Sequence, residues 1–195
     1  MTRNFTLIAA ALAATSGLVA APAFADNHKT AMASENVPTV GGAPMYPTKT
    51  IVENAVNSQD HTTLVAAVQA AGLVEALSSP GPFTVFAPTN AAFAKLPAGT
   101  VETLVQPENK ETLTGILTYH VVSGRVSASE LIGMIDANGG KAELTTLSGG
   151  TLTAAVEGGM VVLTDAAGGK ATVTQADVFQ SNGVIHVTDT VSLPG

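Results

Sequence analysis

The first half of the chain has apolar residues three and four positions apart, which is the spacing of one helix face. Between Thr48 and about His120 this pattern predicts short helices around residues 51–56, 64–71, 73–77, 90–96, 101–105 and 107–120. One continuous apolar run, Phe83–Ala87, lies between the stop signal Ser79–Pro82 and Pro88, and it predicts a buried strand. This half is therefore expected to be helical with a single strand.

The second half changes to the short period of strands. A capping box, Ser127–Glu130, predicts one further helix, and double glycines then recur at 139–140, 149–150, 158–159 and 168–169. Glycine accepts the positive φ of tight hairpin turns, so strands are expected at 141–147, 151–156, 160–164, 171–177 and 184–189. The predicted fold class is α+β, with N-terminal helices packed on a mainly antiparallel sheet or wedge formed by the C-terminal half.

The N-terminus has the features of an export signal. Arg3 gives a positive start, an apolar run follows, and Ala23-Phe24-Ala25 is a small-x-small cleavage site. We expect cleavage after Ala25 and a secreted product, periplasmic or extracellular, without stable membrane insertion. Residues 26–47 lack any period and read as a flexible leader, and residues 48–195 as one domain.

Composition excludes several functions. The chain has 195 residues, a formal net charge of −7 and no cysteine. An acidic surface repels phosphate backbones, so we expect no nucleic-acid partner. Without cysteine there is no thiol catalysis, no cysteine-zinc site and no iron–sulfur cluster, and stability must come from packing.

The histidines do not form a catalytic or metal-binding pattern. The chain has four, His28, His61, His120 and His186, and none forms a close ligand pair. His120 extends an apolar helix face and His186 lies in a strand, so both are predicted to be core residues; an approach between them would make stability depend on pH. No nucleophile elbow or phosphate loop is present, so we expect no enzyme, cofactor or metal.

Three motifs in order identify a family resemblance. Phe83–Phe93, with Ala-Pro-Thr-Asn between a strand and a helix, the pair Tyr119-His120, and Asn182–Asp189, with Asn-Gly-Val-Ile-His-Val, resemble the signatures of the fasciclin domain. The likeness covers roughly Thr48–Pro194. Pro88 can end the strand, Thr89 or Asn90 can cap the helix, and Asn182-Gly183 fits a turn. These are structural functions.

The resemblance implies binding. Fasciclin domains are extracellular or cell-surface modules associated with adhesion, and in some animal relatives integrin contact is assigned to the tyrosine–histidine segment and to an Asp-Ile pair. Tyr119, His120, Asp177 and Val178 occupy those places here, with valine for isoleucine. We therefore expect a partner among cell-surface proteins, matrix components or polysaccharides. An exported protein that binds a small ligand or lipid is the alternative, and the oligomeric state stays open.

Overall fold

The helices lie mostly in the first half of the chain, as predicted. The structure is a computed structural model that describes residues 37–195. Its α-helices are α1 Ile51–Ala55, α2 Thr62–Ala71, α3 Val74–Ser78, α4 Asn90–Ala94, α5 Thr100–Leu104, α6 Lys110–Tyr119 and α7 Ala128–Ala137. Two 3-10 turns, η1 Gln59–His61 and η2 Pro107–Asn109, lead directly into α2 and α6.

The strands form one large sheet and one small hairpin within the described residues. They are β1 Thr39–Val40, β2 Ala43–Pro44, β3 Phe83–Pro88, β4 Val121–Ser123, β5 Lys141–Thr145, β6 Thr151–Glu157, β7 Met160–Thr164, β8 Lys170–Gln180 and β9 Gly183–Thr188. The large sheet has the order β4-β3-β9-β8-β7-β6-β5, and β1 pairs with β2. The run from β5 to β9 is antiparallel throughout, so the predicted meander and the α+β class are confirmed.

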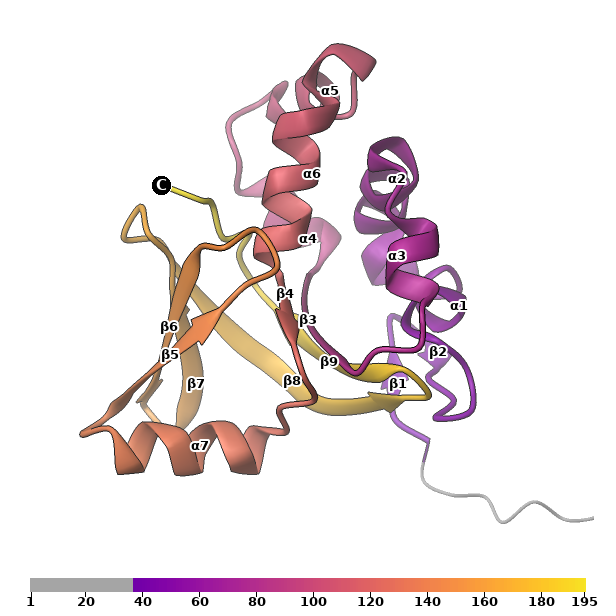
Figure 1. The fold of residues 1–195 in the computed structure, drawn as a ribbon. Helices are drawn as coiled ribbons and strands as arrows, with labels where there is room; N and C mark the ends of the chain where they lie inside the picture. The colour runs from indigo at the N-terminus through magenta and orange to yellow at the C-terminus, as the bar shows by residue number, and fades with distance from the viewer. Residues whose placement is uncertain (1–36) are drawn as a thin grey trace, which may run out of the picture. The chain divides into compact units, whose positions relative to one another are not determined.

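The pairing of β3 with β9 is parallel, and this was not predicted from the sequence. Phe83 pairs with Gly183 and Phe86 with His186, so the first and third motifs lie side by side on neighbouring strands of the sheet (Figure 1). Gly183 allows this approach, because a Cβ there would lie 2.1 Å from the Phe83 carbonyl oxygen. Glycine is therefore needed at position 183 because the two strands approach closely, and not because of the turn conformation predicted above.

The sheet curls until its two ends meet. The segment after β5 returns to β4, where the Leu147 N–H donates to the Val121 carbonyl at 2.7 Å and Val122 bridges Thr146. Unpaired strand edges invite association with other chains, so this closure protects both ends of the sheet. Neither β4 nor the closure was predicted from the sequence.

Alternation along β3 divides the core in two. Val85 and Ala87 face a cluster formed with α1 to α6, whereas Phe86 between them faces a second cluster enclosed by the curled sheet and α7. Successive strand side chains point to opposite faces, so one strand supplies both cores. In Figure 1, α1, α2 and α3 stand on one side of β3 and β9, and α7 crosses the end of β5 and β6.

The predicted helix starts are confirmed in part. Thr89 caps α4 by accepting from the Ala92 N–H, and Ser127 forms the expected capping box with Glu130. Asp60, an acidic residue just before α2, lies inside η1, and α2 has no side-chain cap. Asn90 does not cap α4; its side chain instead joins the η1–α2 segment to α4.

The predicted leader needs a correction. The predicted signal peptide, residues 1–25, and the start of the leader lie outside the described residues. The rest of the leader is packed: β1 and β2 form a hairpin, and Val40, Ala43 and Met45 are buried against the helical core. The sequence has no period here because only alternate residues of a very short hairpin turn inward. The packed domain therefore begins before Thr48.

Asn182 fixes the helical layer to the sheet. Its Oδ1 accepts from the Ile51 N–H at 3.0 Å, at the start of α1, and its Nδ2 donates to the Leu77 and Ser79 carbonyls at the end of α3. A buried pair of amide side chains, Asn54 and Gln180, joins α1 to β8. The first residue of the third motif, Asn182, therefore holds α1 and α3 in place.

Candidate functional site

Tyr119 is fully buried, and its side chain links α6 to the sheet. Its hydroxyl donates to the Thr151 carbonyl at 2.7 Å and accepts from the Ala166 N–H at 3.0 Å. Burial raises the pKa of Tyr119, so the phenol stays protonated. The ring lies directly against Gly150, where a Cβ would come within 2.6 Å of it. Tyr119 therefore offers its hydroxyl and ring to this chain and not to the surface.

His120, the next residue, is buried with both ring nitrogens satisfied. Nδ1 donates to the Ile116 carbonyl at 2.8 Å, and Nε2 accepts from the Ser192 N–H at 3.0 Å. These partners fix the neutral tautomer with its proton on Nδ1. Burial lowers the pKa of His120, and Ile116 and Asp165 offset this only partly. His120 therefore anchors the C-terminal segment to the end of α6.

Asp177 is held at a bulge in β8. It has a φ of 57°, the only positive φ among the described residues other than glycine. Its Oδ1 accepts from the Ala128 N–H at 2.7 Å, at the start of α7, so its half-buried carboxylate supports that helix. Val178 beside it has no exposed surface and pairs with Ile185 in the core.

Phe86 connects the histidines of the two motifs. Its N–H donates to the His120 carbonyl at 2.9 Å, and its ring stacks on His186 with centroids 5.6 Å apart. The His186 Nε2 donates to the Val126 carbonyl at 2.8 Å, and its Nδ1 accepts from the Asp177 N–H. Burial lowers the pKa of His186 as well. The four predicted site residues thus belong to one buried framework, in which Asp177 alone is partly open to solvent.

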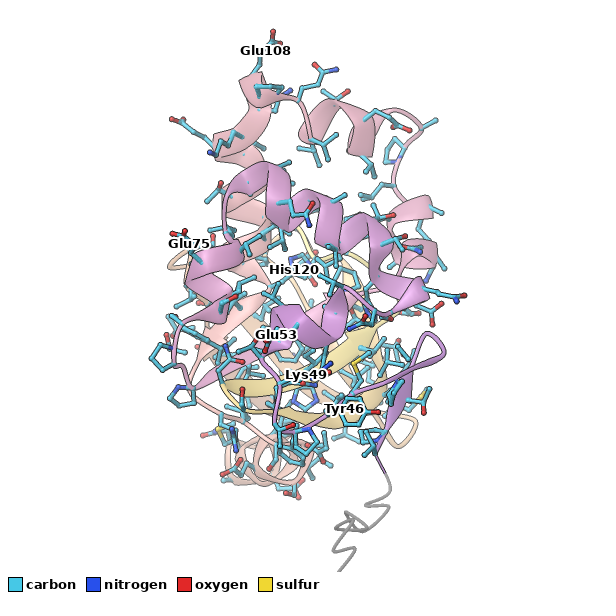
Figure 2. The ribbon with its side chains drawn as sticks, turned by 90° about the vertical axis from the view of Figure 1, so that its right-hand side faces the viewer. Tyr46, Lys49, Glu53, Glu75, Glu108 and His120 are labelled. Atoms are coloured by element: carbon cyan, nitrogen blue, oxygen red, sulfur yellow. The ribbon has the colours of Figure 1, made fainter. Side chains whose placement is uncertain are left out.

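The exposed face of the helical layer is acidic, with few cations. Figure 2 looks onto this face, where Glu53, Glu75 and Glu108 lie outside and His120 lies behind the helices. Lys49 lies over the Tyr46 ring, with Nζ 5.3 Å from its centroid. A cation over an aromatic face is attracted to it, so this contact covers the half-exposed Tyr46.

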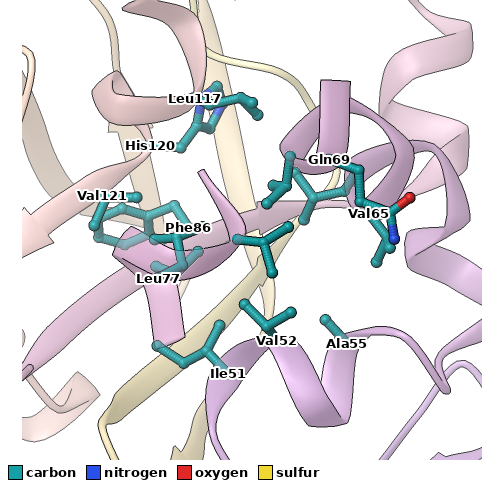
Figure 3. Close-up of a pocket in the computed structure, with 14 residues that line it drawn as sticks. Ile51, Val52, Ala55, Val65, Gln69, Leu77, Phe86, Leu117, His120 and Val121 are labelled. Atoms are coloured by element: carbon teal, nitrogen blue, oxygen red, sulfur yellow. The ribbon is translucent and has the colours of Figure 1, made fainter. Parts of the chain in front are cut away.

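A narrow apolar cavity lies between the helices and the sheet (Figure 3). It is small, ≈ 40 Å³, and it is bounded by α1, α2 and α3 on one side and by β3, the end of α6 and the start of β4 on the other. A second space of ≈ 30 Å³ adjoins it towards β1 and β2. Both are lined by Ile51, Ala55, Leu64 and Val85.

This cavity was not predicted from the sequence, because no motif indicates it. Its lining residues read as ordinary helix core, and only their placement on three helices and one strand leaves space between them. The polar side chains among them are Gln69, His61 and His120, and no charged side chain lines either space. Within residues 37–195 there is no cluster of three potential metal ligands and no helix long and apolar enough to cross a membrane.

The fold and its paired motifs define a domain of the fasciclin class. The fasciclin domain family model matches residues 59–194, so the chain belongs to this family. The resemblance drawn from the three motifs is thereby confirmed. The fold is also similar to about half of a domain pair from the insect cell adhesion molecule fasciclin I, with a TM-score of 0.66 and 20% identity over 74% of this chain and 51% of that one.

Relatives occur in bacteria and in animals. Protein sll1483 of Synechocystis is 52% identical over 161 residues, which are 83% of this chain and 82% of the relative. The immunogenic protein MPB70 of Mycobacterium bovis is 37% identical over 72% of this chain and 66% of its own length. The transforming growth factor-beta-induced protein ig-h3 of Sus scrofa is 35% identical over 76% of this chain, but only over 20% of its own length.

Proposed function

We propose that this protein is a secreted, non-enzymatic attachment protein that binds a component of a cell surface or of an extracellular polymer. The observation that supports this most is the fasciclin domain, which spans residues 59–194 and thus most of the described chain. The matched insect domain pair comes from a cell adhesion molecule. In addition, the histidines within the motifs are engaged in structural hydrogen bonds, which favours binding over catalysis.

The contact surface is proposed at the bulged part of β8. Tyr119, His120 and Val178 are buried, so their side chains can only shape this surface from beneath. Asp177 is half-buried, and Phe179, two residues further along β8, is 39% exposed. Exposed aromatic side chains frequently provide much of the binding energy of protein interfaces. We therefore assign the contact to Phe179 and the backbone around Asp177.

Attachment can be tested with a pair of surface variants. Phe179→Ser removes the aromatic group from the proposed contact, whereas Met160→Ser removes an even more exposed apolar side chain from the hairpin end of β7. Beads coated with each variant are mixed with envelopes of the host. We expect Phe179→Ser to lower bead capture about tenfold and Met160→Ser to leave it unchanged.

Two outcomes would contradict the proposal at different levels. Equal capture by the two variants would remove Phe179 from the contact while leaving attachment in place. No capture by the unsubstituted protein, together with normal aggregation and biofilm formation in a deletion strain, would remove attachment itself. Urea unfolding of both variants checks that each is folded.

A further inference from the structure

Two asparagines of the sequence are followed by glycine, in the pairs Asn138-Gly139 and Asn182-Gly183. In such a pair the backbone nitrogen of the glycine can attack the side-chain carbonyl carbon of the asparagine, because glycine has no Cβ to hinder the approach. The new C–N bond closes a succinimide ring, and ammonia leaves. Water then opens the ring and produces aspartate or isoaspartate. This deamidation needs no enzyme and no cofactor, so the fold around each pair decides whether it proceeds.

The first pair lies at the exposed end of α7. Asn138, Gly139 and Gly140 are all exposed and link α7 to β5. The two glycines have φ values of 74° and 98°, and a Cβ on either would meet no atom within 4 Å. The attacking N–H of Gly139 donates to the Asp136 carbonyl only over 3.4 Å, and Nδ2 of Asn138 donates to the Met134 carbonyl at 2.8 Å. The pair can therefore reach the geometry of attack without moving a buried side chain, and such local opening costs little free energy.

The second pair is held inside the fold. Asn182 is 7% exposed, and its side chain accepts from the Ile51 N–H and donates to two carbonyls at the end of α3. Gly183 pairs with Phe83, where a Cβ would lie 2.1 Å from the Phe83 carbonyl oxygen. Attack here requires that α1 and α3 separate from the sheet, and opening of a core element costs nearly the full free energy of unfolding. The same dipeptide is thus present once in an open and once in a closed environment.

We propose that Asn138 is a site of spontaneous deamidation in the folded protein and that Asn182 is protected from it. The product carries a carboxylate at the C-terminal end of α7, where the helix dipole is negative. Asp136 is already present in the last turn of α7, and no basic residue is. The reaction also removes the donor to the Met134 carbonyl. Deamidation therefore weakens the end of the helix that covers the second core, and this inference does not depend on the proposed attachment function.

Peptide mapping measures both pairs in one experiment. Trypsin cleaves after Arg125, Lys141 and Lys170, so peptides 126–141 and 171–195 contain Asn138 and Asn182, each as its single asparagine. The full-length protein is kept in a mildly alkaline buffer well below its unfolding temperature, and mass spectrometry with fragmentation follows the conversion of each asparagine to the acid. We expect Asn138 to convert at least about tenfold faster than Asn182. Part of the product should be isoaspartate, which direct hydrolysis of the side chain does not produce.

The unfolded protein is the control for the effect of the fold. In concentrated urea the two pairs lose their different surroundings, so Asn138 and Asn182 should convert at similar rates. A large difference that persists in urea would mean that the neighbouring sequence, and not the fold, protects Asn182. No conversion of Asn138 in the folded protein, or equal conversion of both asparagines there, would likewise overturn the proposal.

A matched pair of substitutions tests the consequence for α7. Asn138→Asp and Asn109→Asp make the same chemical change, and each removes a donor to a backbone carbonyl, that of Met134 or that of Thr103. Asn109 lies at the start of α6, where a negative charge is favourable, whereas Asn138 lies at the end of α7. We expect Asn138→Asp to lower the urea midpoint of unfolding more than Asn109→Asp does. Equal midpoints of the two variants would contradict the proposed weakening of α7.

Discussion

Mild acid should destabilise this protein sharply because three of its histidines are buried in the neutral form. His61, His120 and His186 are at most 3% exposed, and burial lowers the pKa of each. The nearest carboxylates, Asp60, Asp165 and Asp177, oppose this shift but do not reverse it. In the unfolded chain each histidine regains a pKa of about 6.5. As the pH falls below that value, the unfolded state therefore binds protons that the folded state does not.

The sign and size of the effect follow from this difference in bound protons. The free energy of unfolding falls with falling pH by about 1.4 kcal/mol per pH unit for each such histidine, or about 4 kcal/mol per unit for three. Between pH 7 and pH 5.5 the integrated loss is about 1.2 kcal/mol per histidine and nearly 4 kcal/mol in total. A small domain is stable by only about 5–15 kcal/mol, so this loss is a large part of its stability. The loss stops where the lowered pKa values of the folded state are reached.

Urea unfolding at a series of pH values measures this directly. Some carboxylates have a pKa that is lowered by hydrogen bonds, such as Glu53 and Glu130 in the two capping boxes. They titrate below the pH range in which the histidines of the unfolded chain titrate, so they do not contribute to the slope measured there. Replacing His186 by glutamine, an uncharged donor and acceptor, should reduce the slope by about one third. A change of less than about 1 kcal/mol between pH 7 and pH 5.5, or a slope that His186→Gln does not alter, would refute the reasoning.

Substitutions at three further positions test the framework by chemical denaturation. Asp177→Asn should change the free energy of unfolding by less than about 0.5 kcal/mol, because asparagine tolerates the positive φ and can still accept a hydrogen bond from Ala128. Asp177→Ala should lower it by about 1–2 kcal/mol. Equal effects of the two substitutions would contradict this account. Asn182→Ala should cost about 2–4 kcal/mol, since it leaves an N–H of α1 and two carbonyls of α3 unpaired, and a cost below about 1 kcal/mol would show that water replaces the side chain. Tyr119→Phe should cost about 1–3 kcal/mol by leaving the Ala166 N–H unpaired; an unchanged unfolding midpoint would contradict that account.

The local signals of the sequence predicted much of the fold. Ser127 begins α7 with a capping box, and the glycine pairs separate β5, β6 and β7. Such features depend on neighbours within a few positions, so they can be read from the chain directly. The predicted burial of His120 and His186 is also confirmed, because each extends an apolar pattern.

The candidate site was predicted less completely. Tyr119 and Asp177 were placed at a contact surface by family resemblance, and the structure shows that Tyr119 is buried and that Asp177 supports α7. The involvement of these segments in adhesion stays a prediction. The positive φ of Asp177 had no signal in the sequence, since it results from a bulge that the pairing of β8 with β9 creates.

The sequence by itself determined the positions of most helices and strands, several of their caps and turns, and the family, because these depend on residues close together in the chain. Only the tertiary structure decided that Phe83–Pro88 pairs in parallel with Gly183–Thr188, and that the sheet closes on itself. It also decided that α1, α2, β3 and β9 leave a small apolar space beside His61. These properties depend on which faces meet across long stretches of chain, and no local pattern specifies that.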